Sequence, residues 1–269
     1  MDITASLWIL DAYGMDMVTT RIEWGSTEIK GPVHTYRERL MLSRLRLYMT
    51  GGMILDAGCG TGSLALALVE KKFNVFGIER SASGLRWLMQ KADLTNRSVT
   101  VVQASVESIP FCYNMFDAIV CGEVLEHLDD DMAAVADFYR ILKPGGICVV
   151  TVPANPQMWS FCDEYAGHQR RYTQAGLTNL FISNGFQVLD VENWGFPLIR
   201  LYQRFVFRPY VWRQQKKSLS KERATTKLLS TKSKSLVDVV SQIAATFFSL
   251  DNLFLRGRHG VGFLLVAQK

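Results

Sequence analysis

A glycine-rich turn after a short apolar strand constrains this chain more than any other feature. Residues 53–57 are apolar apart from Asp56, and they lead into Gly58, Gly60 and Gly62. Glycine places no side chain between the backbone and a ligand, and it adopts positive φ angles that other residues avoid. The G-x-G-x-G spacing is one residue shorter than the dinucleotide-binding G-x-G-x-x-G pattern, which disfavours a hydride-transfer enzyme. We therefore expect the turn to bind another nucleotide-like molecule.

Strands and helices alternate over most of the chain. Short β-branched runs that alternate with amphipathic helices predict an α/β fold with a parallel sheet covered on both faces. Ligands of such sheets bind at the carboxyl ends of the strands. The expected strands are Ile54–Ala57, Asn74–Glu79, Val99–Gln103, Phe116–Cys121, Ile147–Val152 (after a turn at Lys143–Gly146), Phe186–Val191 and Val261–Gln268, and the expected helices are Tyr36–Met49, Ser63–Lys72, Ser83–Leu94, Asp130–Leu142 and Gln174–Ser183.

Composition favours a single cytoplasmic unit. The chain has 269 residues, of which 48% are apolar, enough for a sizeable core. Its five cysteines form no C-x-x-C pair and mostly lie in apolar runs, which indicates reduced thiols. The first 20 residues lack the Lys or Arg of a signal peptide, and no apolar run approaches the ~20 residues of a membrane span. We expect a cytoplasmic protein that can still lie on a membrane surface.

Four motifs identify a family resemblance. Glu79 ends the second expected strand and follows Asp56 by about 20 residues, where such folds place an acceptor for ribose hydroxyls. Together with Ile54–Gly62, Phe116–Val120 and Leu142–Gly146, it resembles the motifs of class I S-adenosylmethionine-dependent methyltransferases, in the ubiquinone-biosynthesis-like (methyltransferase type 11) branch. The resemblance covers roughly residues 34–195 and the final strand. It implies a doubly wound seven-stranded sheet with an antiparallel last strand.

The resemblance assigns cofactor contacts by position. It implies that Glu79 accepts hydrogen bonds from both ribose hydroxyls and that Asp56 holds the loop or the amino group of S-adenosylmethionine. Ser105 stands where the family usually has Asp, so its neutral hydroxyl should hold adenine less firmly. Cys121 and Gly122 would line the methionine end through their backbone. The implied cofactor-binding residues are Asp56, Gly58, Cys59, Gly60, Gly62, Glu79, Ser105, Val106, Cys121 and Gly122.

One candidate acceptor site follows the fourth expected strand. Methyl transfer to a hydroxyl needs proximity and a base. Glu123, Glu126 and His127 are spaced to lie on one side of a helical turn, where they could share a divalent ion. This pattern resembles the E-x-x-E-H metal site of ubiquinone O-methyltransferases and of small-RNA 3′-end 2′-O-methyltransferases. In the RNA enzymes a further His completes the site, and His168 is the matching residue here.

A second interpretation of these residues needs no metal. Related methyltransferases without metal also carry a Glu-His pair, in which the His packs beside the cofactor and the Glu caps a helix. His168 would then act as a general base, because imidazoles titrate near neutral pH. Arg170 and Arg171 could grip an acidic substrate group, or one of them could pair with Asp163 or Glu164. The candidate catalytic residues are His168, His127 and Glu126.

The segments before and within the strand-helix pattern are expected to have separate roles. Residues 1–50 form an N-terminal helical lid or substrate segment hinged near His34, Tyr36 and Arg37, or else a helix that packs on the sheet edge. Residues 51–269 form the methyltransferase domain, with an insertion at about 196–258. The His-x-x-Arg of residues 34–37, the G-H-x-R-R-Y of residues 167–172 and the long tail also resemble methyltransferases of glycan, lipid or secondary-metabolite pathways, which does not fix a substrate.

The insertion is basic and aromatic. Residues 200–234 hold eleven Lys or Arg and one acidic residue, Glu222, with five aromatic residues at their start. Apolar residues from Leu236 onward then recur at steps of four and three, which predicts an amphipathic helix. The segment is a solvated surface arm, a nucleic-acid contact through phosphates, or a peripheral membrane contact over residues 200–256. The apolar set is Leu236, Val240, Ile243, Phe247, Leu250 and Phe254.

These observations predict an S-adenosylmethionine-dependent methyltransferase. Its expected acceptor is an oxygen on a small or lipid-like molecule, such as a secondary metabolite. One alternative is an RNA ribose 2′-O-methyltransferase with a divalent metal site. Another is a non-catalytic protein that binds the cofactor to regulate a partner.

Overall fold

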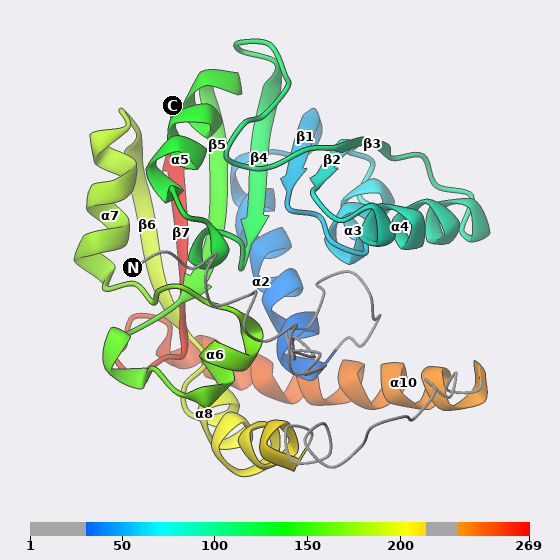
Figure 1. Ribbon diagram of the computed structural model, residues 1–269, viewed down its shortest axis with the longest axis vertical. Helices are drawn as coiled ribbons and strands as arrows, with labels where there is room; N and C mark the ends of the chain where they lie inside the picture. Colours follow the sequence, from blue (N-terminus) through cyan, green and yellow to red (C-terminus); the bar gives the residue numbers. More distant parts are fainter. Residues whose placement is uncertain (1–30, 214–230) are drawn as a thin grey trace, which may run out of the picture.

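The fold is organised by one seven-stranded sheet. The computed structural model describes residues 31–213 and 231–269, with side chains over 31–213 and 239–269. The strand order is β3-β2-β1-β4-β5-β7-β6 (Figure 1). β1 to β5 pair in parallel, and β7 pairs antiparallel with both β5 and β6. The strands are β1 Met53–Ala57, β2 Asn74–Glu79, β3 Thr100–Gln103, β4 Phe116–Gly122, β5 Leu142–Pro153, β6 Gln187–Trp194 and β7 Gly262–Gln268.

Helices cover both faces of the sheet. Successive strand side chains point to opposite faces, so Val149 joins one hydrophobic cluster and Val150 the other. The first cluster lies under α2, α3, α4 and α10, and the second under α5 and α7. The predicted doubly wound α/β fold is confirmed. The helices are α2 Pro32–Tyr48, α3 Ser63–Glu70, α4 Ala82–Leu94, η1 Leu125–His127, α5 Asp131–Ile141, η2 Pro156–Met158, α6 Phe161–Ala166, α7 Gln174–Ser183, α8 Leu198–Tyr202, η3 Gln203–Phe207, α10 Thr231–Phe248 and η4 Ser249–Phe254.

Two expectations about packing need correction. The turn expected at Lys143–Gly146 is part of β5, where Leu142 pairs with Phe116 and Ile147 pairs with Ala118 across an irregular register. The extra residues bulge, because five steps along β5 oppose two along β4. The helix expected on the sheet edge, α2, instead packs against the inner strand β5 and against α10. None of the helices in the described part of the chain has the length and apolarity needed to cross a membrane.

The turn glycines differ in the space around them, which predicts unequal effects of alanine. A Cβ at Gly62, where φ is 80°, would lie 2.0 Å from Cδ1 of buried Leu88, whereas one at Gly60, where φ is 51°, would meet no atom within 4 Å. Both substitutions strain the backbone, but only Gly62→Ala also overpacks the core. We expect Gly62→Ala to lower the free energy of unfolding by about 2 kcal/mol more than Gly60→Ala in urea denaturation. Equal losses would contradict this assignment.

Candidate functional site

The glycine turn joins β1 to α3 at the carboxyl edge of the sheet. The backbone N–H groups of Gly58 and Cys59 both donate to the Ile78 carbonyl oxygen at 2.9 Å, which anchors the turn to β2. Gly58, Gly60 and Gly62 all have positive φ angles. L side chains rarely adopt these angles, so the three glycines allow the chain to make this turn.

Glu79 lies at the end of β2 and reaches the same turn. Its carboxylate accepts the N–H of Gly60 at 3.1 Å and that of Ser81 at 2.7 Å. Each carboxylate oxygen retains capacity for a further hydrogen bond. Glu79 thus lies beside the glycine turn, although 19 residues separate it from Gly60 along the chain.

Asp56 is the acidic residue within β1 and is almost fully buried. Its Oδ2 has no hydrogen-bond partner. Burial, with a smaller contribution from the neighbouring Glu38 carboxylate, raises the pKa of Asp56 to about 8. A buried carboxyl oxygen without a partner is unusual and indicates a ligand with a donor group. With the open space at Gly60 and the acceptor Glu79, it fits a ligand with an amino group and a ribose.

The other residues expected to touch a cofactor contribute in different ways. Ser105 follows β3, and its Oγ accepts the N–H of Glu107 at 3.3 Å. The side chains of Cys59, Val106 and Cys121 are buried in the hydrophobic clusters. These three side chains therefore contribute to the core beside the candidate site. Gly122 ends β4 beside Met41, whose Sδ would lie 3.2 Å from an added Cβ.

Glu126, His127 and His168, called here the Glu-His group, meet beyond the end of β4. One potential ligand atom from each residue lies within 4.8 Å of the other two. Glu126 and His127 lie on η1, and His168 follows α6. Nε2 of His168 is 3.9 Å from Oε1 of Glu126, and the ring centroids of His127 and His168 are 4.9 Å apart. The structure thus brings together all three candidate catalytic residues.

Hydrogen bonds at Nδ1 orient both imidazoles. Nδ1 of His168 lies 3.0 Å from Oδ1 of Asp163, and Nδ1 of His127 lies 3.1 Å from the Gly167 carbonyl oxygen. A carbonyl oxygen or a carboxylate only accepts, so Nδ1 carries the proton in each ring and Nε2 is the basic nitrogen. This is the tautomer that a general base or a metal ligand requires.

Asp163 is itself held firmly. It is buried, accepts from Arg171 Nε at 2.7 Å, and accepts from the Ser160 N–H at 2.8 Å as part of the α6 capping box. Burial opposes its charge, but the hydrogen bonds from His168 and Arg171 lower its pKa overall. The expectation that Arg170 or Arg171 pairs with Asp163 or Glu164 is confirmed for Arg171. The sequence did not single out Asp163 as the partner of His168.

Glu126 is fully buried, and neither of its oxygens has a hydrogen-bond partner. Burial, followed by repulsion from Glu123, raises the pKa of Glu126 well above its usual range. Burial and the neighbouring His168 lower the pKa of His127. Both environments therefore favour the uncharged forms, a protonated Glu126 carboxyl and a neutral His127 imidazole.

The structure departs from expectation at Glu123. The helical turn that would align Glu123 with Glu126 and His127 is not formed, because η1 begins only at Leu125 and Glu123 has a φ of 56°. Glu123 pairs instead with Arg37 at 3.6 Å and does not belong to the Glu-His group. Its expected role as a metal ligand therefore lacks the geometry on which it rested.

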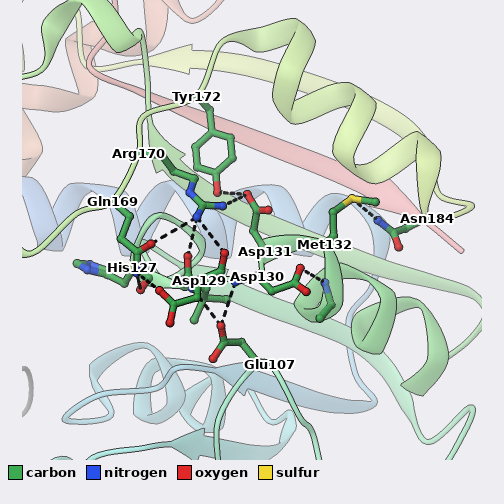
Figure 2. Close-up of polar contacts among 12 residues, drawn as sticks. Glu107, His127, Asp129, Asp130, Asp131, Met132, Gln169, Arg170, Tyr172 and Asn184 are labelled. Carbon is green, nitrogen blue, oxygen red and sulfur yellow. Dashed lines mark hydrogen bonds and ion pairs between the residues drawn. The ribbon is translucent and has the colours of Figure 1, made fainter. Parts of the chain in front are cut away.

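Arg170 joins the loop that carries His168 to the residues that follow His127. It donates to the carbonyl oxygens of Leu128 and Asp129 and forms an ion pair with Asp131 at 3.0 Å (Figure 2). Asp131 also accepts from the Tyr172 hydroxyl at 2.7 Å. These contacts fix the loop after α6 against the loop after η1. The pairing across about 40 residues has no local sequence signal.

The first turns of α2 border the glycine turn. Nε2 of His34 lies 3.0 Å from Oγ of Ser63, which also hydrogen-bonds Glu38. Tyr36 points elsewhere: it is buried, and its hydroxyl donates to Asn252 at 2.7 Å. The expected hinge residues thus divide into His34 and Arg37 near the candidate site and Tyr36 in the core.

Comparisons with known proteins point to one family. A family model described as "Methyltransferase domain" matches residues 55–150. The ubiquinone biosynthesis O-methyltransferase of Psychrobacter arcticus is 30% identical over 159 residues, which cover 53% of this chain and 62% of that protein. The enzyme of the same name from Alkalilimnicola ehrlichii is 34% identical over 119 residues, which cover 42% and 47%. The matched regions therefore span less than two thirds of these relatives.

Solved structures share the fold over nearly the whole chain. A putative sarcosine dimethylglycine methyltransferase from Galdieria sulphuraria has a TM-score of 0.62 at 14% identity and covers 99% of this chain and 98% of its own. The phosphoethanolamine N-methyltransferase 2 of Haemonchus contortus, in complex with S-adenosylmethionine, has a TM-score of 0.59 at 17% identity, with 94% and 60% covered. The [4+2]-cyclase SpnF has a TM-score of 0.61 at 19% identity, with 98% and 92% covered. Since a cyclase shares the fold, the fold alone does not define the reaction.

Proposed function

We propose that the protein is an S-adenosylmethionine-dependent methyltransferase acting on an oxygen of a small or lipid-like acceptor, from the premise that residues 55–150 match a methyltransferase-domain family model. The observation that carries the choice of oxygen is the His168–Asp163 pair beside buried Glu126. A hydroxyl acceptor needs a base, and the orientation of His168 supplies one. Calorimetry with S-adenosylmethionine, followed by a labelled-methyl screen over lipid, glycan and RNA extracts, tests the proposal.

The residues around the glycine turn would hold the cofactor. Bound S-adenosylmethionine supplies a methyl group on a sulfonium, which is already a good leaving group. Glu79 would accept from the ribose hydroxyls, and Asp56 would accept from the amino group. Ser105 would hydrogen-bond the adenine as a neutral group. The N-terminal segment expected at 1–50 is described only from residue 31, and we propose that residues 31–50 serve as a lid or substrate segment on residues 51–269. His34, which lies beside Ser63, and Arg37, which pairs with Glu123, support this role.

His168 would remove the proton from the acceptor. Its Nε2 would take the hydroxyl proton while the acceptor oxygen bonds to the methyl carbon and the bond from that carbon to the sulfonium sulfur breaks, which leaves a neutral thioether. The imidazolium formed on His168 is stabilised by the negative charge of Asp163 at 3.0 Å. Arg171 and Ser160 keep Asp163 in place and so act as positioning residues.

The buried Asp56 carboxyl predicts a pH-dependent affinity for the cofactor. Its pKa of about 8 leaves it mostly protonated at pH 7, whereas an ammonium group binds the carboxylate. Affinity should therefore rise with pH up to about 8 and fall about tenfold per pH unit below that value. Calorimetry at pH 6, 7 and 8 measures this, and Asp56→Asn should remove the dependence. A flat profile for the wild type would exclude Asp56 as the acceptor.

The same buried carboxyl predicts that Asp56→Asn stabilises the protein when no cofactor is bound. The unfolded chain loses the Asp56 proton near pH 4, but the folded protein keeps it up to about pH 8, so this group's contribution to stability falls as pH rises between the two values. Asp56→Asn removes the cost of charging a buried carboxyl. We expect a higher Tm for Asp56→Asn at pH 8 in the absence of S-adenosylmethionine. A lower Tm would mean that Asp56 supports the fold.

A second candidate function is methylation of an RNA ribose 2′-hydroxyl with a bound divalent metal. The metal part of this function is favoured by one Glu126 oxygen, which has no hydrogen-bond partner and lies within 4.8 Å of a nitrogen of each imidazole. One carboxylate and two imidazoles suit a divalent transition metal, which would neutralise the buried carboxylate. Calorimetry with Mn²⁺, Co²⁺ or Zn²⁺ should then show one site that is lost in Glu126→Gln. Activity that is unchanged in chelator, with no metal binding, would remove this candidate.

A further inference from the structure

Helix α10 turns its apolar stripe away from the protein. Val240, Ile243 and Phe247 are all exposed, Phe247 to 62%, while Ser241 and Ala245 on the opposite side are buried. A helix that packs only on its own protein shows the reverse pattern, with the apolar stripe inward. The amphipathic helix expected from Leu236 onward is thus formed, but its apolar face has no partner within the described residues.

A second exposed apolar segment lies next to α10. Phe205 on η3 is 67% exposed, and Tyr210 and Trp212 beyond it are about half exposed. The two segments are tied together, because the Tyr202 ring packs 5.5 Å from that of Phe248 and Asp251 accepts the N–H groups at the start of α8. Figure 1 shows α8 and α10 at the end of the molecule where α6 lies, beyond the arrowhead of β4.

Both segments are basic as well as apolar. Arg204, Arg208 and Arg213 on the first, and Arg256 and Arg258 after the second, are exposed. In residues 198–213 and 239–261 the one acidic residue is Asp251, which is buried. This surface therefore presents positive charge beside exposed aliphatic and aromatic side chains, with no exposed acidic group among these residues.

We propose that this basic apolar surface, formed by residues 201–213 and 239–258, docks on an anionic lipid bilayer. Phe, Ile and Val side chains gain by leaving water for the acyl boundary, Tyr and Trp suit the headgroup level, and Arg attracts anionic lipids. A second copy of the chain would bring Arg against Arg, because a two-fold interface uses the same patch on both subunits. RNA would pair with the Arg groups but would leave the aliphatic stripe in water.

The surface adjoins the candidate acceptor site. The Arg208 guanidinium lies 5.7 Å from the ring centre of Phe161, at the start of α6, and α6 also carries Asp163. If the proposed methyltransferase activity holds, docking would bring the Glu-His group to the membrane interface. The acceptor would then be an amphiphile with its hydroxyl near the headgroups.

Vesicle co-sedimentation of the full chain tests the docking. We expect binding to vesicles of equal parts phosphatidylglycerol and phosphatidylcholine, and at least tenfold weaker binding to phosphatidylcholine alone. Val240→Glu/Ile243→Glu/Phe247→Glu should lose at least tenfold in affinity for the anionic vesicles. The neutral variant Val240→Ser/Ile243→Ser/Phe247→Ser should also weaken binding. The matched control Met89→Glu/Leu94→Glu/Ile182→Glu, with three added charges at exposed apolar positions elsewhere, should bind as the wild type does.

Three outcomes would overturn the docking surface. They are absence of vesicle binding at low salt, binding that both triple variants retain, and a concentration-dependent dimer in sedimentation that the triple variants abolish. Tm and S-adenosylmethionine affinity, measured on every variant, separate misfolding from loss of docking. Those two quantities should stay unchanged, so failure to bind vesicles and failure to bind the cofactor would be recognised independently.

Discussion

Replacing His168 with alanine is expected to slow methyl transfer by about 10²-fold or more, with little change in S-adenosylmethionine affinity. A positioned general base contributes about 10² to 10⁴ in rate, and the structure orients Nε2 of His168 through Asp163 at 3.0 Å. The measurement is kcat with the acceptor found in the labelled-methyl screen, alongside calorimetry of cofactor binding. A base role lowers kcat and leaves cofactor affinity intact.

Two further variants test whether the loss of rate comes from His168 acting as a base. Asp163→Asn should lower kcat by a smaller factor and change its pH profile, because an amide can favour the other imidazole tautomer. His259→Ala changes an exposed histidine far from α6 in sequence and should leave kcat unaltered. A wild-type rate for His168→Ala would exclude the proposed base. A drop restored by added Mn²⁺ would indicate a metal ligand instead.

Glu79→Ala is expected to weaken S-adenosylmethionine binding by about 10² to 10⁴-fold. Two hydrogen bonds to a charged acceptor contribute about 1.5–3 kcal/mol each, and the turn loses the carboxylate that holds Gly60 and Ser81. Glu79→Gln keeps one carbonyl oxygen and should give an intermediate loss. Calorimetry or equilibrium dialysis measures both values.

Asp117 is the control for Glu79, because its carboxylate also accepts a backbone N–H group but lies elsewhere in the sheet. Asp117 accepts the N–H of Met53 at 2.8 Å and pairs with Lys143 at 2.7 Å, near the opposite ends of the strands. Asp117→Ala should cost stability and leave cofactor affinity unchanged. Equal loss of affinity in both variants would show that Glu79 acts only through stability.

The α/β fold and the glycine turn were predictable because their signals are local. Strand and helix periodicities, positive-φ glycines and the Glu79 spacing each arise within one or two elements. The bulge in β5 and the course of Glu123 were not predictable, because each depends on a neighbouring strand or loop. The Asp163–His168 and Arg170–Asp131 contacts likewise depend on how separate loops pack.

The turn from Asp56 to Gly62 shows which properties are local to the sequence and which depend on tertiary structure. The sequence by itself determined that a strand must end there in a turn open to a ligand, because backbone conformation and side-chain volume are properties of the residues themselves. Only the tertiary structure decided that one carboxyl oxygen of buried Asp56 has no hydrogen-bond partner, that Glu126 meets two oriented imidazoles, and that the apolar stripe of α10 faces outward. These properties depend on desolvation and on the direction in which a helix packs, which are set by residues distant in the chain.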